Sequence, residues 1–94
     1  MAVSKEEVIA YHQGGKVAVR LPKTLKTKED LCLAYTPGVA HAVREIAARP
    51  ESVYEVTAKS NLVAVVSDGT AILGLGDLGA SASIPVMEGK AVLF

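Results

Sequence analysis

One lysine near the end of the chain has neighbours that suit a proton-transfer role. If the surrounding residues are helical, the side chains three and four positions from Lys90 are those of Val86, Met87, Leu93 and Phe94. An amine on such an apolar face is expected to be partly desolvated, which favours the neutral amine and allows it to act as a general base. The alternative is a lysine whose stem covers apolar surface while its ammonium stays in water.

A tyrosine in the first half of the chain is the matching candidate for a general acid. Tyr35 directly precedes Thr36-Pro37, a pair typical of a helix start because threonine caps the helix and proline fits its first position. The free amides of the first turn, at Gly38 and Val39, would then bind a carboxylate. A phenol at the edge of such a site could donate a proton to the substrate. Alternatively, the ring packs beside the cap as a hydrophobic staple.

A glycine-rich loop offers a third candidate. The run Gly74-Leu75-Gly76-Asp77-Leu78-Gly79 matches the G-x-G-x-x-G pattern of dinucleotide-binding loops. A plain glycine turn is favoured, because the charge of Asp77 would oppose a pyrophosphate and the chain ends before a ribose-binding acid about 20 residues further on. A dinucleotide-binding fragment that uses Gly74, Gly76 and Gly79 is therefore the weaker alternative.

The helices that must position these groups are predicted from caps and hydrophobic spacing. Ser4 and Glu7 have the spacing of a capping box, and Pro50 would end the helix that begins at Thr36-Pro37. Pro85 is expected to disturb the first turns of the last helix. The expected helical segments are 5–13, 37–49, 51–56 and 80–94, with a polar connector at 23–30.

Short strands are expected between these helices. Leu62–Val66 is a continuous apolar run, Asp68-Gly69 is a strong hairpin signal, and Ala71–Leu75 has the pattern of a return strand. Residues 16–20 are a further strand candidate. The predicted fold class is α/β, or α+β, with a small sheet that contains an Asp-Gly hairpin and is flanked by helices.

Composition limits the classes of function. Half of the residues are hydrophobic, and the ten acidic residues balance the ten basic ones. This indicates one folded domain and excludes a basic nucleic-acid-binding surface. The single cysteine, Cys32, cannot form an internal disulfide and fits a reducing compartment. No apolar stretch is long enough to span a bilayer and no signal peptide is visible, so a cytoplasmic protein is expected.

The end of the chain lies inside the last helical pattern, at Val92-Leu93-Phe94. A bare apolar helix end leaves its last carbonyls uncapped and its apolar face uncovered. We therefore expect an incomplete domain that belongs to a longer protein.

Four segments, taken together and in order, resemble the malic enzymes. They lie between about Asp30 and Phe94 and read LAYTPGV at 33–39, NLVAVVSDGT at 61–70, ILGLGDLG at 72–79 and PVMEGKA at 85–91. The resemblance identifies residues 1–94 as the incomplete N-terminal domain of a two-domain enzyme. The NAD(P)-binding Rossmann domain of such an enzyme lies outside this chain.

The resemblance implies an enzyme that oxidatively decarboxylates L-malate to pyruvate and CO₂, with reduction of NAD⁺ or NADP⁺ and with bound Mg²⁺ or Mn²⁺. It assigns the general acid to Tyr35 and the general base to Lys90, and it implies a homodimer. Neither a metal nor a nucleotide is expected to bind these residues alone, and the isolated chain is expected to be inactive.

One departure from the longer, animal-type enzymes concerns substrate binding. The resemblance implies that an arginine follows the Asp-Gly turn there, whereas this chain has Ala71, as in the shorter bacterial and archaeal type. Carboxylate recognition must then come from elsewhere, such as the amide of Gly38. The competing function is an interaction module, in which the uncovered apolar helix mediates dimer formation.

Overall fold

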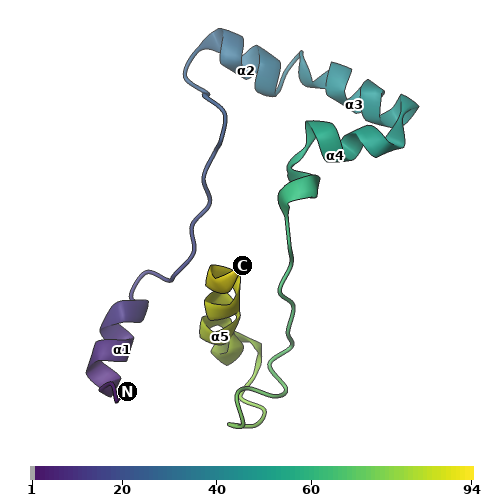
Figure 1. The fold of residues 1–94 in the computed structure, drawn as a ribbon. Coiled ribbons are helices and arrows are strands. Elements are labelled where there is room, and N and C mark those ends of the chain that lie inside the picture. Colours follow the sequence, from purple (N-terminus) through teal and green to yellow (C-terminus); the bar gives the residue numbers. More distant parts are fainter. Residues whose placement is uncertain (1) are drawn as a thin grey trace. The chain divides into compact units, whose positions relative to one another are not determined.

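The computed structural model describes residues 2–94 and divides them into two compact units. The first unit contains the residues up to Val19 together with Ala64–Phe94, and the second contains Arg20–Val63. Figure 1 traces the helices of each unit and the segments between them.

The first unit is built on two helices. Helix α1 covers Lys5–His12 and begins with the predicted capping box, in which Ser4 and Glu7 bond each other's backbone amides. Helix α5 covers Ala80–Leu93 and has Pro85 inside it, as predicted. Because the backbone amide of Ser4 donates to the carboxylate of Glu7, the pKa of Glu7 lies below its ordinary value.

The second unit consists of short helices that follow one another along the chain. Its elements are α2 (Lys28–Ala34), α3 (Val39–Ala48), η1 (Pro50–Ser52), α4 (Val53–Val56) and η2 (Ala58–Asn61). The predicted end of α3 before Pro50 is confirmed, as is helical structure in 51–56. In this unit Pro50 thus marks the end of α3 and the start of the next helical turn.

The predicted sheet is wrong, because the described residues 2–94 contain helices and no strand. The apolar run Leu62–Val66 has no regular secondary structure and makes no backbone hydrogen bond to another described segment. A strand needs a partner for its amides and carbonyls, and the run has none within the described part of the chain. The residues at 16–20 likewise form no strand.

The Asp-Gly turn is closed by side chains instead of a hairpin ladder. Asp68 Oδ1 accepts hydrogen bonds from the amide of Thr70 at 3.1 Å and from its hydroxyl at 2.8 Å. Ser67 Oγ accepts from the amide of Gly69 at 3.0 Å. These bonds satisfy the turn locally, and they lower the pKa of Asp68, chiefly through the hydroxyl of Thr70.

Two element starts also differ from the sequence-based expectation. The stretch expected to be a connector at 23–30 contains the start of α2, where Thr27 and Asp30 form a second capping box. Helix α3 begins at Val39 and not at Pro37, with Gly38 in the N-cap position and no side-chain cap. A Thr-x-x-Asp cap thus starts α2, whereas a turn at 36–38 leads into α3.

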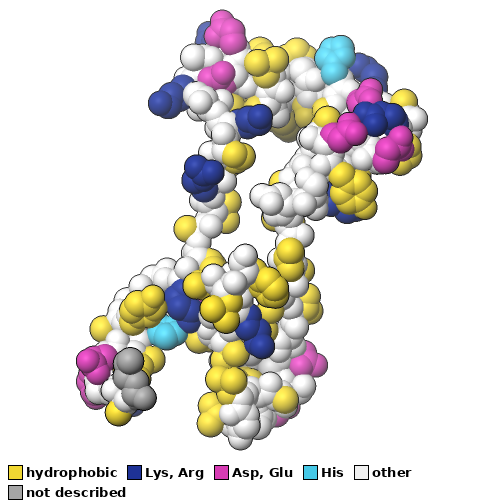
Figure 2. All heavy atoms as spheres, in the orientation of Figure 1, with side chains coloured by type: hydrophobic (Ala, Val, Ile, Leu, Met, Phe, Trp, Pro, Cys, Tyr) yellow, Lys and Arg dark blue, Asp and Glu magenta, His cyan; other side chains and the backbone are white. Residues whose placement is uncertain are grey.

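Burial of apolar side chains is sparse in the described residues. Ile72, with 5% of its surface exposed, is their only buried hydrophobic residue. Figure 2 shows the hydrophobic side chains at the surface of both units. Caps, turns and helical hydrogen bonds therefore carry most of the local structure.

An arginine joins the end of α3 to α4. Arg49 donates to Glu55 Oε2 at 2.8 Å and to Glu45 Oε1 at 3.2 Å, and Figure 2 shows the acidic and basic side chains gathered there. The pKa of Glu55 is lowered, mainly because its carboxylate accepts hydrogen bonds from Arg49. All three side chains are well exposed, so water screens the pair and its contribution to stability is small.

Replacing Arg49 by methionine is expected to return the pKa of Glu55 to about its ordinary value of 4.5, as followed by NMR titration of the carboxyl carbon. Because the pKa is depressed in the folded state, the pair stabilises the fold above that ordinary pKa, and the contribution is lost as pH falls through the folded value. Glu45→Gln is the control, because Arg49 can still bond Glu55. A Glu55 midpoint that does not rise in Arg49→Met contradicts this account.

Candidate active site

Tyr35 stands at the junction of α2 and α3. Its amide donates to the carbonyl of Leu31 at 2.9 Å, and its carbonyl accepts from the amide of Val39 at 2.7 Å. The backbone of the tyrosine is thus fixed at both peptide groups, while 66% of the residue's surface is exposed. The side chain does not pack as a staple, and its phenol is open to a ligand.

The amides that were expected to bind a carboxylate are already engaged. The amide of Gly38 donates to the carbonyl of Cys32 at 2.8 Å, and that of Val39 donates to Tyr35. The next amide, that of Ala40, donates to the carbonyl of Pro37 at 3.4 Å. The hypothesis of free amides at the start of α3 is therefore wrong for the described chain, because the preceding turn supplies the acceptors.

Gly38 has a packing role instead. A Cβ at this position would overlap the carbonyl oxygen of Cys32, so that only glycine allows the turn to lie against the backbone of α2. The glycine sets the position of Val39 and of the helix that it begins. Sequence reasoning saw the missing side chain but assigned the space to a ligand.

Gly38 and Val39 also line a pocket of about 470 Å³ in the second unit. Its wall is mainly aliphatic, with Lys23 and Asp30 as its charged members. One carboxylate oxygen of Asp30 accepts hydrogen bonds from the amides of Lys26 and Thr27. These bonds lower the pKa of Asp30. The full lining is Lys23, Thr24, Asp30, Leu33, Ala34, Gly38, Val39, Ala42 and Val56.

Lys90 lies in the last turn of α5, where a cation complements the negative end of the helix dipole. Lys90 is exposed, although Val86 and Met87 are half-buried. Leu93 and Phe94 are themselves mostly exposed. The expected desolvation of the amine is therefore not seen among the described residues, because Lys90 itself and its neighbours Leu93 and Phe94 are exposed.

The start of α5 is held by a close approach between two glycines. A Cβ on Gly69 would overlap the carbonyl of Gly79, the residue that precedes the helix. Asp77 Oδ1 also accepts the amide of Gly79 at 3.2 Å. The Asp-Gly turn thus packs directly on the beginning of the helix that carries Lys90.

The glycine-rich loop makes turns and shows no dinucleotide-binding geometry. Gly74, Gly76 and Gly79 have positive φ angles of 77°, 86° and 90°, which suit glycine. The amide of Leu75 donates to the carbonyl of Ile72 at 2.7 Å, which closes a tight turn. No strand precedes the loop in residues 2–94, so the βαβ unit that such a fingerprint requires is missing there.

Sequence reasoning missed a set of contacts around Lys16. Its amide donates to Glu88 Oε2 at 2.6 Å, and its ammonium donates to the carbonyl of Pro85 at 2.9 Å. The signal available in the sequence was the Gly14-Gly15 pair directly before the lysine, together with Glu88 as the one acidic residue of the segment 80–94.

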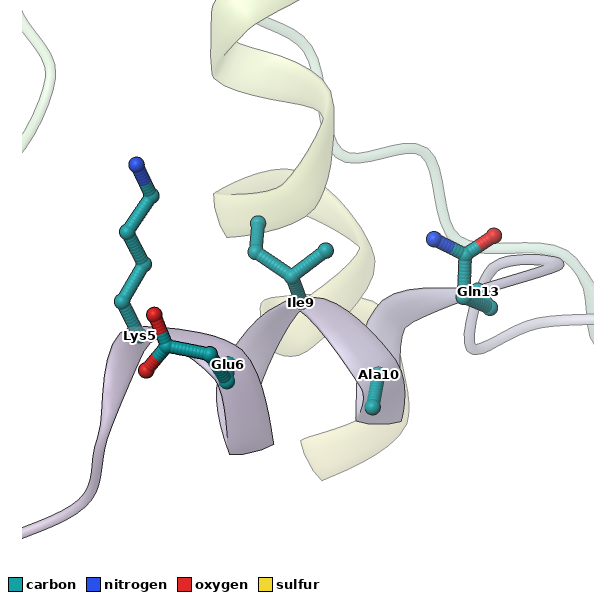
Figure 3. Close-up of a pocket in the computed structure, with 5 residues that line it drawn as sticks. All are labelled: Lys5, Glu6, Ile9, Ala10 and Gln13. Atoms are coloured by element: carbon teal, nitrogen blue, oxygen red, sulfur yellow. The ribbon is translucent and has the colours of Figure 1, made fainter.

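A second pocket, of about 480 Å³, lies on α1 and holds no constellation for catalysis. It is lined by Lys5, Glu6, Ile9, Ala10 and Gln13. Figure 3 shows these side chains along the helix, with the charged Lys5 and Glu6 at one end. No nucleophile or histidine lines the pocket, and we assign it no chemistry.

The chain offers no metal site of its own within the described part. No group of three His, Cys, Asp or Glu side chains in residues 2–94 is arranged to hold an ion.

Comparison with known proteins decides the family. The family described as "Malic enzyme, N-terminal domain" matches residues 14–94. This chain belongs to the malic enzymes. In the described residues 2–94 of this domain there are helices, and the small sheet expected from the strand-like runs at 62–66 and 71–75 is not formed.

Close relatives use either nucleotide. The chain is 58% identical over 96% of its length to an NADP-dependent malic enzyme of Halomonas elongata, and 55% identical over 88% to an NAD-dependent malic enzyme of Geobacillus stearothermophilus. It spans 22% and 17% of the lengths of these proteins.

The similarity to the malic enzymes also holds for the backbone fold, as a solved structure shows. The crystal structure of malic enzyme from Pyrococcus horikoshii matches 95% of this chain with a TM-score of 0.91 and 52% identity, and the match covers 22% of that structure. The two malic-enzyme segments thus share one backbone path. No helix in residues 2–94 is both long and apolar enough to cross a membrane.

Gly69→Ala is expected to destabilise a malic enzyme that carries this chain by about 1–3 kcal/mol more than Gly74→Ala, because overpacking against backbone costs about that much. Both glycines have φ of +77°, but only a Cβ at Gly69 meets another atom. The pair therefore separates the clash from the cost of the backbone conformation. Thermal or denaturant unfolding measures the difference, and equal losses would rule out the contact with Gly79.

Proposed function

We propose that this chain supplies the proton-transfer groups of a malic enzyme. That enzyme converts L-malate to pyruvate and CO₂ and reduces NAD⁺ or NADP⁺. The observation that carries the proposal is the match of the malic enzyme N-terminal domain to residues 14–94, supported by relatives that are named as NAD- or NADP-dependent malic enzymes. The proposed site of action is the cytoplasm.

Lys90 is assigned the role of general base at the C2 hydroxyl of malate. Its amine lies on a long helix whose start is packed against the Asp-Gly turn, and it is exposed to an approaching ligand. As C2 is oxidised to a carbonyl, the hydroxyl proton passes to the amine of Lys90, which accepts it in its unprotonated form. The positively charged lysine that results also offsets the carboxylate charge of the substrate.

Tyr35 is assigned the role of general acid at C3. Loss of CO₂ from the C2 carbonyl compound leaves the enolate of pyruvate, and the phenol proton passes to C3 to give the methyl group. The fixed backbone and exposed ring of Tyr35 support this role, because a proton donor must be held in place and remain accessible. Tyr35 belongs to the second unit and Lys90 to the first.

The divalent cation and the nucleotide are assigned to protein outside these residues. Recognition of the carboxylates of malate is likewise assigned to side chains, because the amides at the start of α3 are engaged. Whether NAD⁺ or NADP⁺ is used depends on the part of the enzyme that binds the nucleotide.

The second proposed role is formation of a homodimer. The observation that favours it is the large apolar surface, which includes Leu33, Val66 and Phe94 at 77%, 87% and 87% exposure. Exposed apolar surface of this extent needs a covering partner, either more of the same protein or a second copy. This role is compatible with the catalytic one.

The proton-transfer roles predict the behaviour of two variants of a malic enzyme that carries this chain. Tyr35→Phe and Lys90→Met are each expected to lower kcat by roughly 10²–10⁴-fold, the usual contribution of a general acid or base. Solvent exchange of the methyl hydrogens of pyruvate should fall in Tyr35→Phe and persist in Lys90→Met, because only the tyrosine serves C3.

Tyr54→Phe and Lys5→Met are the matched controls, since both remove the same groups elsewhere on the exposed surface. They are expected to keep near-normal rates. A Tyr35→Phe enzyme with an undiminished rate would remove the phenol from the mechanism, and an active Lys90→Met enzyme would do the same for the amine.

The isolated 94-residue chain is expected to form no NAD(P)H from malate, because its described residues provide neither a metal site nor a dinucleotide fold. It is also expected to sediment above the mass of a monomer, because its apolar surface is uncovered. Turnover by a chain of verified mass would refute the first expectation, and a clean monomer in analytical ultracentrifugation would count against the dimer role.

A further inference from the structure

Two hydrogen bonds tie the segment after α1 to the helix that carries Lys90. The amide of Lys16 donates to Glu88 Oε2 at 2.6 Å, and the ammonium of Lys16 donates to the carbonyl of Pro85 at 2.9 Å. The same ammonium lies 2.6 Å from Nε2 of His12. All of these residues belong to the first unit, and we refer to this set of contacts as the Lys16 clamp.

The protonation pattern of the clamp follows from its acceptors. Nδ1 of His12 lies 2.8 Å from the carbonyl oxygen of Val8, which can only accept, so Nδ1 carries the proton. Nε2 then has a free lone pair and accepts from the ammonium of Lys16. The hydrogen bond to His12 thus holds the side chain of Lys16 where it also bonds α5. Lys16 thereby links the turn after α1 to both α1 and α5.

The backbone before Lys16 is shaped for this approach. Gly14 and Gly15 have φ angles of +80° and +81°, a conformation that glycine adopts without strain. A Cβ on Gly15 would lie 3.4 Å from both carboxylate oxygens of Glu88, which places this carboxylate beside the glycine. Glu88 and Lys16 are half-buried, unlike most charged residues of the chain.

The clamp holds one side of α5 and leaves the opposite side to Lys90. Successive residues of an α-helix are about 100° apart, so Pro85 and Glu88 lie on one face, about 60° apart. Lys90 is then about 200° from Glu88, on the other side of the axis. A rotation of the helix by a single residue position would therefore swing the amine of Lys90 by about 100°.

We propose that Glu88 and Lys16 are positioning residues that fix the rotation of α5 about its axis and so aim Lys90 at the substrate. The inference rests on the proposed role of Lys90 as general base. It assigns no contact with substrate to either residue. The glycines at 14 and 15 take part because they allow the amide of Lys16 to reach the carboxylate.

The test replaces the carboxylate of Glu88 in a malic enzyme that carries this chain. Glu88→Met keeps the length of the side chain but removes the acceptor, and it is expected to lower kcat by about 10–100-fold with little change in KM, since a small misplacement of a catalytic group has effects of this size. Glu88→Gln keeps an acceptor oxygen for the amide of Lys16 and is expected to recover most of the rate. Lys16→Met, which leaves the amide in place, is expected to lose less than Glu88→Met.

The kinetic isotope effect of malate deuterated at C2 distinguishes positioning from loss of folded enzyme. If the base is misdirected, the chemical step becomes more rate-limiting, and the isotope effect on kcat is expected to rise in Glu88→Met. If the variant only reduces the fraction of folded enzyme, the isotope effect stays at its wild-type value. Glu6→Met, an exposed acid on α1 without a hydrogen bond to α5, is the matched control.

The Lys90→Met enzyme separates failure of this inference from failure of the proposed function. An inactive Lys90→Met enzyme beside a Glu88→Met enzyme with normal kcat and isotope effect overturns the clamp alone. An active Lys90→Met enzyme overturns the role of the base, and the clamp falls with it. A lowered kcat with an unchanged isotope effect in Glu88→Met also overturns the clamp, because that result is the signature of lost fold.

Discussion

Burial of apolar surface is the constraint on which the rest of this structure depends, and the described residues satisfy very little of it by themselves. Ile72 is their only buried hydrophobic side chain, although half of the sequence is hydrophobic. The relatives named above are longer proteins, and this chain spans 22% and 17% of their lengths.

With so little core, short-range hydrogen bonds define the elements. Two capping boxes, at Ser4 with Glu7 and at Thr27 with Asp30, start helices in both units. Close backbone contacts at Gly38 and Gly69 then fix the turns that lead into α3 and α5. These features depend on a few residues each, which explains why they form without a surrounding core.

The catalytic proposal follows from the same arrangement. Tyr35 is exposed on a backbone that is bonded at both of its peptide groups, and Lys90 is exposed on a helix held by the Asp-Gly turn and by Lys16. Each of the two candidate groups thus has an exposed side chain on a segment whose backbone is held in place by hydrogen bonds or packing. Low burial of these groups suits a domain whose substrate pocket is completed by other parts of an enzyme.

The sequence by itself determined the family, the two candidate proton-transfer residues and the helices marked by strong local signals, such as the capping box at Ser4. It failed at Leu62–Val66, because β-branched apolar runs predict strands whether or not a partner strand exists, and pairing is a long-range property. It also failed at Gly38, whose amide bonds Cys32, and it overlooked Glu88. Those outcomes were decided by the tertiary structure, because a local pattern shows which groups need partners, and only the folded chain decides which partners they find.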